Sequence, residues 1–367
     1  MNPIYCLDLK RQYQSIKSEV LAITEKVFEE TSFSGGPYVE KFEKEFAHYC
    51  ETEFSMAVNN GTTALHLAML ALGIGKDDEV ILPANTFIAT AWGISYVGAK
   101  PVFVDCSPDT WEIDISEIES KITPKTKAIA GVHLYGQAFD IEGVMKICKK
   151  HNLFLIEDAA QAQGAKYKGQ KVGSFGDVAC FSYYPGKNLG AYGEAGGMTT
   201  NSESIFKHVQ ILKNHGSSVR YHHTEIGYNY RMDGLQGGIL SIKLKYLDQW
   251  NDKRKQIAKR YQKEITNPLI TMQSQPDFAE SVYHLFVITT PNRNHFIDYL
   301  SKNQIFAGLH YPVPCHLQTA YAFLGHQKGD FPNAEYLSDH CVSLPMYAEL
   351  TSQEVSFVIH TINNYAL

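Results

Sequence analysis

The sequence predicts an α/β fold in which helices flank a mostly parallel β-sheet and a smaller α/β unit follows. Short apolar runs alternate with segments of helical spacing from about residue 54 to residue 156, which is typical of repeated strand–helix units on a parallel sheet. After residue 200 a long polar segment, a long amphipathic helix and a mixture of strands and helices follow. We therefore expect a large domain over residues 1–249 and a small C-terminal domain over residues 250–367.

Each expected element rests on its own hydrophobic pattern. Short apolar runs predict buried strands at 54–58, 79–82, 101–105, 127–132 and 153–156. Helical spacing of apolar residues predicts helices at 62–72, 86–97, 141–149 and 202–213, and segment 113–122 is amphipathic. We then expect a polar, aromatic loop at 216–231, one long helix at 235–261, a strand at 283–289 and a helix at 294–302. Ligands of such sheets bind beyond the carboxyl ends of the strands, so the residues that follow each strand are the candidates.

The composition excludes several classes of protein. Lys and Arg total 33 against 39 Asp and Glu, and this net charge of −6 argues against a dedicated nucleic-acid binder, which carries a basic excess. The seven cysteines are scattered without a CxxC pair, so we expect reduced thiols, no metal site and a cytoplasmic location. The uncharged run 80–99 is long enough to span a bilayer. Its polar residues and its change of period predict a strand, a loop and a helix instead, and no membrane partner.

The first candidate segment is Asn59-Asn60-Gly61-Thr62-Thr63, between an expected strand and an expected helix. Gly61 lets the backbone approach a ligand, and the following amides open a helix whose dipole favours an anion. The segment therefore predicts a phosphate cradle. A capped helix with nothing bound is the alternative, because Thr caps helices routinely.

Two further strand ends carry Phe87 and the pair Glu157-Asp158. Phe87 can stack on a planar cofactor or belong to the core. Asp158 ends an apolar strand, where a carboxylate can hold a metal, pair with a cationic ring or cap the next helix. All of these interpretations stay open for the two segments taken alone.

The fourth segment, FSYYPGKNLG, places Lys187 in a neutral loop of Gly, Pro and aromatic residues. Its nearest charged neighbours along the chain are Asp177 and Glu194, which is unusual for a solvated surface lysine. Burial in such surroundings lowers the pKa of a lysine amine and frees it for Schiff-base chemistry. The segment is not a GxxxxGK[ST] phosphate loop, because Asn188 follows the lysine.

Together these segments supply what pyridoxal 5′-phosphate needs from a protein. Lys187 can bind the cofactor, Asp158 can pair with its pyridinium nitrogen, an amide cradle can hold its phosphate and Phe87 can cover its ring. We therefore predict a pyridoxal-phosphate enzyme with Lys187 and Asp158 as catalytic residues.

At this point the sequence resembles the DegT/StrS family of sugar-nucleotide aminotransferases, which are fold type I pyridoxal-phosphate transferases of the aspartate aminotransferase fold. The resemblance covers nearly the whole chain and rests on segments that occur in order. They are SGGPYVEKFEKEFAHYC, NNGTTALHLAMLALGIGKDDEVILPANTFIAT, GVHLYGQ, IEDAAQAQGA, GSFGDVACFSYYPGKNLGAYGEAGG, GYNYRMDGLQ and GLHYPVPCHLQ.

The resemblance implies a role for each matching position. Lys187 is similar to the family's Schiff-base lysine and Asp158 to the partner of the pyridinium nitrogen. Gln161 is similar to the residue near the cofactor's 3-hydroxyl, and Phe87 stands where the family has a stacking aromatic. The positions that resemble phosphate ligands are Gly61, Thr62, Thr63, Ser182 and Asn229. Of these, Asn229 resembles a contact donated across a dimer interface, so the resemblance also implies a homodimer with shared active sites.

The wording YPGKNLGA resembles the branch that aminates carbon 3 of a 3-keto sugar. This implies transfer of an amino group from an amino acid, with L-glutamate expected, to a nucleotide-sugar substrate, a dTDP-3-keto-6-deoxyhexose. In that branch His310 and Tyr311 would face the substrate, with Arg220 and Tyr183 near the pyrophosphate or the sugar. A core-packed strand end is the alternative for His310 and Tyr311.

Other functions stay open at the level of the sequence. A carbon 4 or UDP-ketosugar aminotransferase would share these motifs. Sugar dehydration on the same scaffold uses His in place of the lysine, and aldol-type cleavage of an amino acid matches the segments less well. A non-enzymatic regulatory protein on the same scaffold belongs to another class, against which the intact Lys187 and Asp158 argue.

Overall fold

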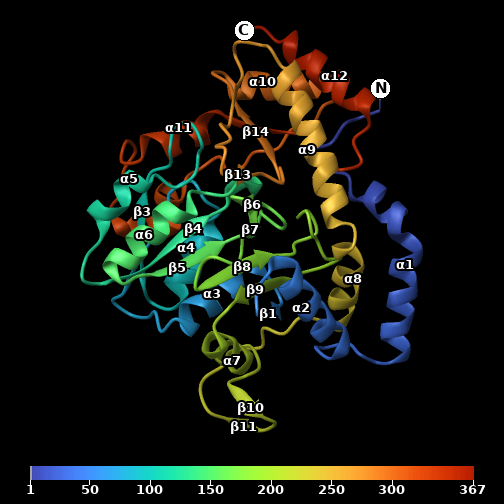
Figure 1. Cartoon of the computed structure of the whole chain (residues 1–367). Helices are drawn as coiled ribbons and strands as arrows, with labels where there is room; N and C mark the ends of the chain where they lie inside the picture. The colour runs from blue at the N-terminus through green and yellow to red at the C-terminus, as the bar shows by residue number, and fades with distance from the viewer. Residues whose placement is uncertain (1) are drawn as a thin grey trace.

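A seven-stranded sheet forms the centre of the molecule in the computed structural model, which describes residues 2–367 (Figure 1). Across the sheet the strands are β1 Phe54–Val58, β9 Gly196–Thr200, β8 Val178–Ser182, β5 Phe154–Asp158, β4 Thr126–Val132, β2 Glu79–Pro83 and β3 Lys100–Val104. Only β9 pairs antiparallel with its neighbours, β1 and β8. The other pairs are parallel, so the prediction of a mostly parallel sheet is confirmed.

Helices cover both faces of this sheet. One face packs against α2 Pro37–Cys50, α5 Ile115–Ile118, α6 Ile141–His151 and α8 Gly234–Leu244, and the other against α3 Gly61–Ala71, α4 Ile88–Tyr96 and α7 Glu203–Leu212. Alternate strand residues serve the two faces. Ile129 joins the first core, whereas Ala128 and Ala130 on the same strand join the second. Burial on both faces explains why the strands are continuous apolar runs rather than alternating ones.

A third core is built mainly by the C-terminal part of the chain (Figure 1). The antiparallel strands β12 Thr271–Met272, β14 Phe286–Thr289 and β15 Cys341–Leu344 pack with α9 Leu247–Glu264, α10 Arg293–Lys302 and α12 Ser352–Asn363. Ile4 joins this core from the N-terminus, while Cys315, Tyr321 and Phe331 pack against the main sheet. The domain boundary between residues 249 and 250 falls inside α9 and stays a prediction.

The remaining elements are short, apart from the N-terminal helix α1 Leu9–Glu29. They are β6 Lys166–Tyr167, β7 Gln170–Lys171, β10 Ser217–Val219, β11 His222–His223, β13 Ala279–Glu280, α11 Pro332–His340 and the 3-10 turns η1 Glu119–Lys121, η2 Leu134–Gly136, η3 Cys315–Leu317 and η4 Thr319–Leu324. Within residues 2–367, no helix is long and apolar enough to cross a membrane. Over the same residues, no group of three or more His, Cys, Asp and Glu is placed to hold a metal ion.

Two expectations about elements are wrong. The single helix expected over 235–261 is broken into α8 and α9 at Lys245–Tyr246. One tertiary contact holds the break, because the hydroxyl of Tyr246 donates to Glu19 of α1, and locally its ring stacks on Trp250 in the first turn of α9. The segment 216–231, expected to be a loop, contains the β10–β11 hairpin, which projects beyond α7 at the bottom of the view (Figure 1).

Candidate active site

The predicted site residues meet at the carboxyl ends of the strands. Asp158 is the last residue of β5, Lys187 follows β8, and Phe87 lies between β2 and α4. Gly61 begins α3 directly after β1. These strands point the same way, so their carboxyl ends lie along one edge of the sheet.

Asp158 is a buried carboxylate that faces this edge. Its Oδ2 accepts a hydrogen bond of 2.7 Å from the Thr90 hydroxyl, and its Oδ1 accepts one of 3.1 Å from the Ala160 amide. Burial raises the pKa of Asp158, and the Thr90 hydrogen bond, the Ala160 amide and the charge of Lys187 offset this only in part. A cation in front of the carboxylate would restore its charge, which fits a protonated pyridine ring.

The neighbouring carboxylate, Glu157, points to the opposite face of β5 and has a structural role. It accepts hydrogen bonds from the amides of Gly173, Phe175 and Gly176 and contacts His133 Nε2 at 3.0 Å. Burial opposes its ionisation, but the bonds to His133 and to the amides outweigh burial and hold its pKa below the usual value. Glu157 therefore has its hydrogen-bonding capacity filled within the protein, whereas Asp158 is available to a ligand.

Lys187 has the lowered pKa that amine chemistry requires. Burial lowers the pKa of its ammonium group to about 8, and the charge of Asp158 opposes this change. The loop that carries it is anchored on both sides, since the Lys187 amide donates to Tyr184 O and the Asn188 side chain donates to Asn251 and Val282. At a pH near 8 about half of these side chains carry a neutral amine.

A cradle for a phosphate lies where α3 begins beside the end of β8. A Cβ atom on Gly61 would stand 2.8 Å from Cβ of Ser182, so only glycine permits this approach. The Asn60 side chain accepts from the Thr63 amide, and the amides of Gly61 and Thr62 precede the first backbone hydrogen bond of the helix. The Thr63 hydroxyl is directed at Asn59 and at the Asn60 carbonyl. The groups best placed for a phosphate are therefore those of Gly61, Thr62 and Ser182.

Aromatic and amide side chains line the rest of this edge. The ring of Phe87 is 48% exposed and lies 5.3 Å from the ring of Tyr311. Gln161 joins them, because its Nε2 donates to the Tyr311 hydroxyl at 2.9 Å and its Oε1 accepts from the Tyr135 amide. His310 lies near Lys187, and burial together with the lysine charge lowers its pKa to about 4. The alternative of a core-packed strand end does not describe Tyr311, whose hydroxyl is bonded to a site residue.

The structure contradicts the predicted substrate contact of Tyr183. Its side chain is fully buried, with its ring 5.3 Å from Phe42 and 5.4 Å from Phe46. The reason is that the alternation of β8 continues one residue past its end at Ser182, so Phe181 and Tyr183 enter the same core. Arg220 lies in the β10–β11 hairpin and packs over the ring of Tyr221, whereas Asn229 follows the hairpin and pairs with Asn214 at its base. Their contacts across a dimer stay predictions.

The prediction from the sequence did not include several residues of the site. Thr90 binds Asp158 directly, and Thr86 binds Thr90 at 2.8 Å. Thr90 lies in the first turn of α4, and Thr86 lies just before the N-cap residue of that helix. Both belong to the segment NTFIAT, but the sequence alone does not show that they contact each other. His284 and Tyr135 come to the site from distant parts of the chain, and no local pattern identifies them.

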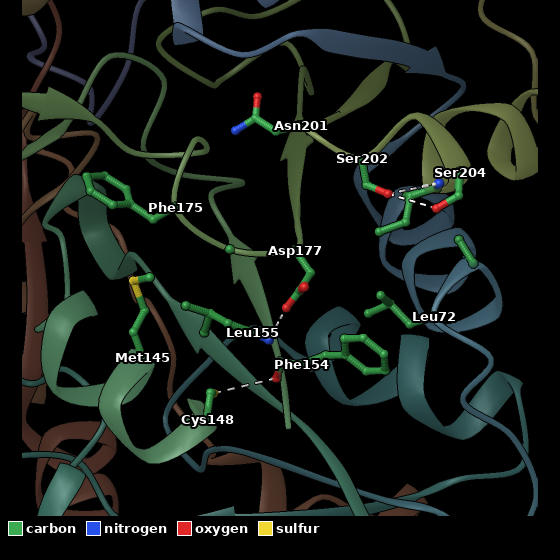
Figure 2. Close-up of a pocket in the computed structure, with 13 residues that line it drawn as sticks. Leu72, Met145, Cys148, Phe154, Leu155, Phe175, Asp177, Asn201, Ser202 and Ser204 are labelled. Carbon is green, nitrogen blue, oxygen red and sulfur yellow. Dashed lines mark hydrogen bonds between the residues drawn. The ribbon is translucent and has the colours of Figure 1, made fainter. Parts of the chain in front are cut away.

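A groove of about 600 Å³ lies at the opposite, amino edge of the sheet (Figure 2). Phe154, Leu155 and Asp177 line it, together with Asn201 and Ser202 from the end of β9. Its carboxylate is already engaged, because Asp177 Oδ2 accepts from the Leu155 amide at 2.8 Å (Figure 2). The groove therefore lacks the reactive groups found at the carboxyl edge.

This fold and this site define a fold type I pyridoxal-phosphate transferase. The chain belongs to the DegT/DnrJ/EryC1/StrS aminotransferase family, whose pattern it matches over residues 14–363. It is 44% identical over 359 residues to the dTDP-3-amino-3,6-dideoxy-α-D-galactopyranose transaminase of Aneurinibacillus thermoaerophilus, covering 98% of each chain. It is 38% identical to the dTDP-3-amino-3,4,6-trideoxy-α-D-glucose transaminase of Streptomyces venezuelae, over 98% of this chain and 95% of that one.

Solved structures agree with this assignment. The crystal structure of DesV from S. venezuelae superposes with a TM-score of 0.97 at 38% identity, covering 99% of this chain and 98% of that one. The sugar aminotransferase Spr1654 of Streptococcus pneumoniae in its pyridoxal-phosphate form superposes with a TM-score of 0.89 at 28% identity, over 95% of each chain. The chain is therefore a pyridoxal-phosphate-dependent sugar-nucleotide aminotransferase. The lowered pKa of Lys187, the buried carboxylate of Asp158 and the glycine-only approach at Gly61 fit this cofactor.

Proposed function

We propose that the protein transfers an amino group from L-glutamate to carbon 3 of a dTDP-3-keto-6-deoxyhexose, giving a dTDP-3-amino-3,6-dideoxyhexose. The observation that carries this choice is the 44% identity, over 98% of both chains, to a transaminase named for a dTDP-3-amino-3,6-dideoxygalactose. The S. venezuelae relative, also named for a dTDP-3-amino sugar, supports the same carbon atom.

The geometry supports a division of labour among the residues of this chain. When bound, pyridoxal phosphate supplies an electron sink for the bond that breaks at the amino-bearing carbon. Lys187 would take the proton from that carbon and deliver it to the C4′ carbon of the cofactor, because its pKa of about 8 allows both forms near neutral pH. Asp158 holds the proton on the ring nitrogen through an ion pair, and Thr90 fixes the orientation of that carboxylate.

The remaining residues bind and orient. The amides of Gly61 and Thr62 and the Ser182 hydroxyl hold the phosphate, so the ring stays in place while its bonding to amines changes. Phe87 covers the ring, and Gln161 lies beside it through its bond to Tyr311. We further propose a homodimer in which Asn229 and Arg220 reach the partner's site, since Arg220 lies in the projecting β10–β11 hairpin and Asn229 is exposed at the base of that hairpin.

The experiment compares substrates side by side. Purified protein is given glutamate with a dTDP-3-keto sugar, a dTDP-4-keto sugar or a UDP-3-keto sugar, and the amino sugar is measured by mass spectrometry. We expect a yellow protein, a cofactor trapped on Lys187 by borohydride, and at least tenfold preference for the dTDP-3-keto sugar. The Lys187→Ala variant should lose turnover and the trapped adduct. Equal turnover of the 4-keto sugar would contradict the proposed carbon atom.

Other relatives are named for a UDP or a GDP sugar, and the UDP-3-keto sugar in this experiment tests the first of these alternatives. The chain is 39% identical to a UDP-N-acetyl-3-dehydro-α-D-glucosamine 3-aminotransferase of Acidithiobacillus ferrooxidans and 38% identical to a GDP-perosamine synthase of Escherichia coli O157:H7. It is also 40% identical to a protein of Geobacillus stearothermophilus named as a pleiotropic regulator. A regulatory role for this chain would require that the wild type turn over none of the three ketosugars.

A further inference from the structure

His284 lies beside the Lys187 loop, at the seam between the main sheet and the C-terminal core. A Cβ atom on Gly136 would stand 2.9 Å from the His284 amide nitrogen and 3.2 Å from Gln161 O. The next residue, Leu285, donates its amide to Tyr135 O. His284 Nδ1 is 3.2 Å from Oδ1 of Asn188, the residue that follows the lysine. The imidazole is therefore held among residues of the active site, although no reaction step has been assigned to it.

A chain of three side chains fixes which nitrogen of His284 carries the proton. Asn251 Nδ2 donates to the Gln163 carbonyl at 2.9 Å, so Asn251 Oδ1 is the acceptor that Asn188 Nδ2 meets at 2.8 Å. Asn188 Nδ2 also donates to the Val282 carbonyl at 3.1 Å. Main-chain carbonyls only accept, so both amides have one allowed orientation. Asn188 Oδ1 then needs a donor, and His284 Nδ1 must carry the hydrogen.

The other ring nitrogen, Nε2, is consequently a hydrogen-bond acceptor. A neutral imidazole has one N–H and one lone pair, so protonation at Nδ1 leaves the lone pair on Nε2. Burial lowers the pKa of His284 well below its usual value, and the charges of Lys187, Arg254 and His310 act in the same direction. The ring therefore stays neutral, and Nε2 stays an acceptor, at the pH at which Lys187 works.

The tautomer of His310 is not fixed in this way. Its Nδ1 faces the Ser343 hydroxyl at 2.8 Å, and a hydroxyl can donate or accept. The two imidazoles near Lys187 therefore differ, because only His284 has its tautomer fixed by groups of one polarity. A fixed acceptor is suited to a ligand that brings a hydrogen-bond donor.

We propose that His284 is a positioning residue for the keto sugar, whose hydroxyl next to the carbonyl carbon donates a hydrogen bond to Nε2. The carbonyl carbon must come close to the amine of Lys187, which moves the proton, so the hydroxyl on the adjacent carbon comes into this region. Apart from the amine that itself reacts, the amino-acid donor carries only carboxylates and no such hydroxyl, and a lone pair does not bind a carboxylate. His284 therefore acts in the sugar half-reaction and not in the glutamate half-reaction. This inference rests on the proposed role of Lys187 but not on the carbon atom or the nucleotide.

Two substitutions of His284 test the contributions of Nδ1 and Nε2 separately. His284→Asn keeps an amide that can donate to Asn188 Oδ1 but removes the distant acceptor, whereas His284→Gln restores an acceptor oxygen near the position of Nε2. Each half-reaction is followed by stopped-flow absorbance with the loaded enzyme. We expect the Asn variant to slow the sugar half-reaction at least tenfold and to change the glutamate half-reaction less than twofold. The Gln variant should recover part of the sugar rate.

A readout independent of activity tests the tautomer itself. In protein labelled with ¹⁵N-histidine, the resonance absent from the Asn variant identifies His284, and its Nε2 should have the shift of an unprotonated nitrogen. A protonated Nε2 would overturn the inference, and so would equal slowing of both half-reactions or an unchanged sugar rate. If the wild type itself processes no ketosugar, the proposed function fails and this role fails with it. If the wild type is active and the His284→Asn variant has the same half-reaction rates, only the proposed role of His284 is refuted.

Discussion

The two edges of the central sheet differ in whether their charged side chains are already paired within the protein. The amino edge has a groove of about 600 Å³, but Asp177 there is already bound to the Leu155 amide. At the carboxyl edge, the pKa of Lys187 is lowered and the pKa of Asp158 is raised, although the charge of each opposes the shift of the other. The functional edge is therefore identified by buried charged groups that lack full compensation, and not by the size of an open groove.

The same contrast appears between neighbours on one strand. Glu157 has three amide donors and His133, and its pKa lies below the usual value. Asp158 has one hydroxyl and one amide, and its pKa is raised. Structural and functional carboxylates can thus be told apart by the completeness of their hydrogen bonding.

Removing the charge at the carboxyl edge should have the largest effect. Asp158→Asn keeps the shape of the side chain but cannot form an ion pair with a protonated ring. We expect the cofactor to bind more weakly but to remain bound at saturating concentration, and turnover to fall on the order of 10²–10⁴-fold, measured by steady-state kinetics with the absorbance of the bound cofactor. Unchanged turnover would refute the role of Asp158.

The second largest effect is expected from loss of the hydrogen bond that Thr90 donates to Asp158. Thr90→Val removes the 2.7 Å hydrogen bond to Asp158 Oδ2, so the pKa of the carboxyl rises further and the ion pair weakens. We expect roughly tenfold weaker cofactor binding by the apoprotein, measured by titration at several pH values. Thr86→Val is the matched control, because Thr86 contacts Thr90 and not Asp158. Equal losses in the two variants would mean a general packing defect.

A buried lysine behind the active loop should affect stability rather than chemistry. Lys243 Nζ donates to Gly190 O at 2.6 Å and lies 3.9 Å from the centre of the Tyr192 ring. Burial lowers its pKa from 10.5 to about 7. Between about pH 7 and 10.5 the unfolded chain therefore binds more protons, and the free energy of unfolding rises with pH.

Lys243→Met should remove that contribution. We expect the slope of the unfolding free energy against pH to decrease by up to about 1.4 kcal/mol per pH unit between pH 7 and 10. Denaturant unfolding of the apoprotein measures this slope. Lys245→Met serves as the control, because that side chain is 59% exposed. A slope that is the same in wild type and in Lys243→Met would show that this ammonium is hydrated.

The smallest functional effect is expected at the amino edge. Asp177→Ala removes the bond to the Leu155 amide at the start of β5 and should lower stability by about 1 kcal/mol. Because the groove takes no part in the reaction, kcat/KM should stay within twofold of wild type. A tenfold loss of kcat/KM in a folded variant would show that both edges serve the reaction.

Much of the site could be predicted because it follows strand ends. Asp158, Lys187, Phe87 and Gly61 each lie just beyond an apolar run, and parallel strands bring such positions to one edge. The prediction failed for Tyr183, which required knowing the face to which each residue of β8 points. A shift of one position reverses the two faces of a strand, and Tyr184, the next residue, is 55% exposed.

The sequence by itself determined the alternation of strands and helices, the shared edge of the strand ends and the lysine isolated from charge, because these are properties of short segments. Only the tertiary structure decided what surrounds them. The pairing of Thr90 with Asp158 spans 68 residues, and that of His284 with Asn188 spans 96. Such contacts depend on the packing of separate elements. Hydrogen-bond partners and burial, which set the pKa of Lys187 and Asp158, exist only after folding.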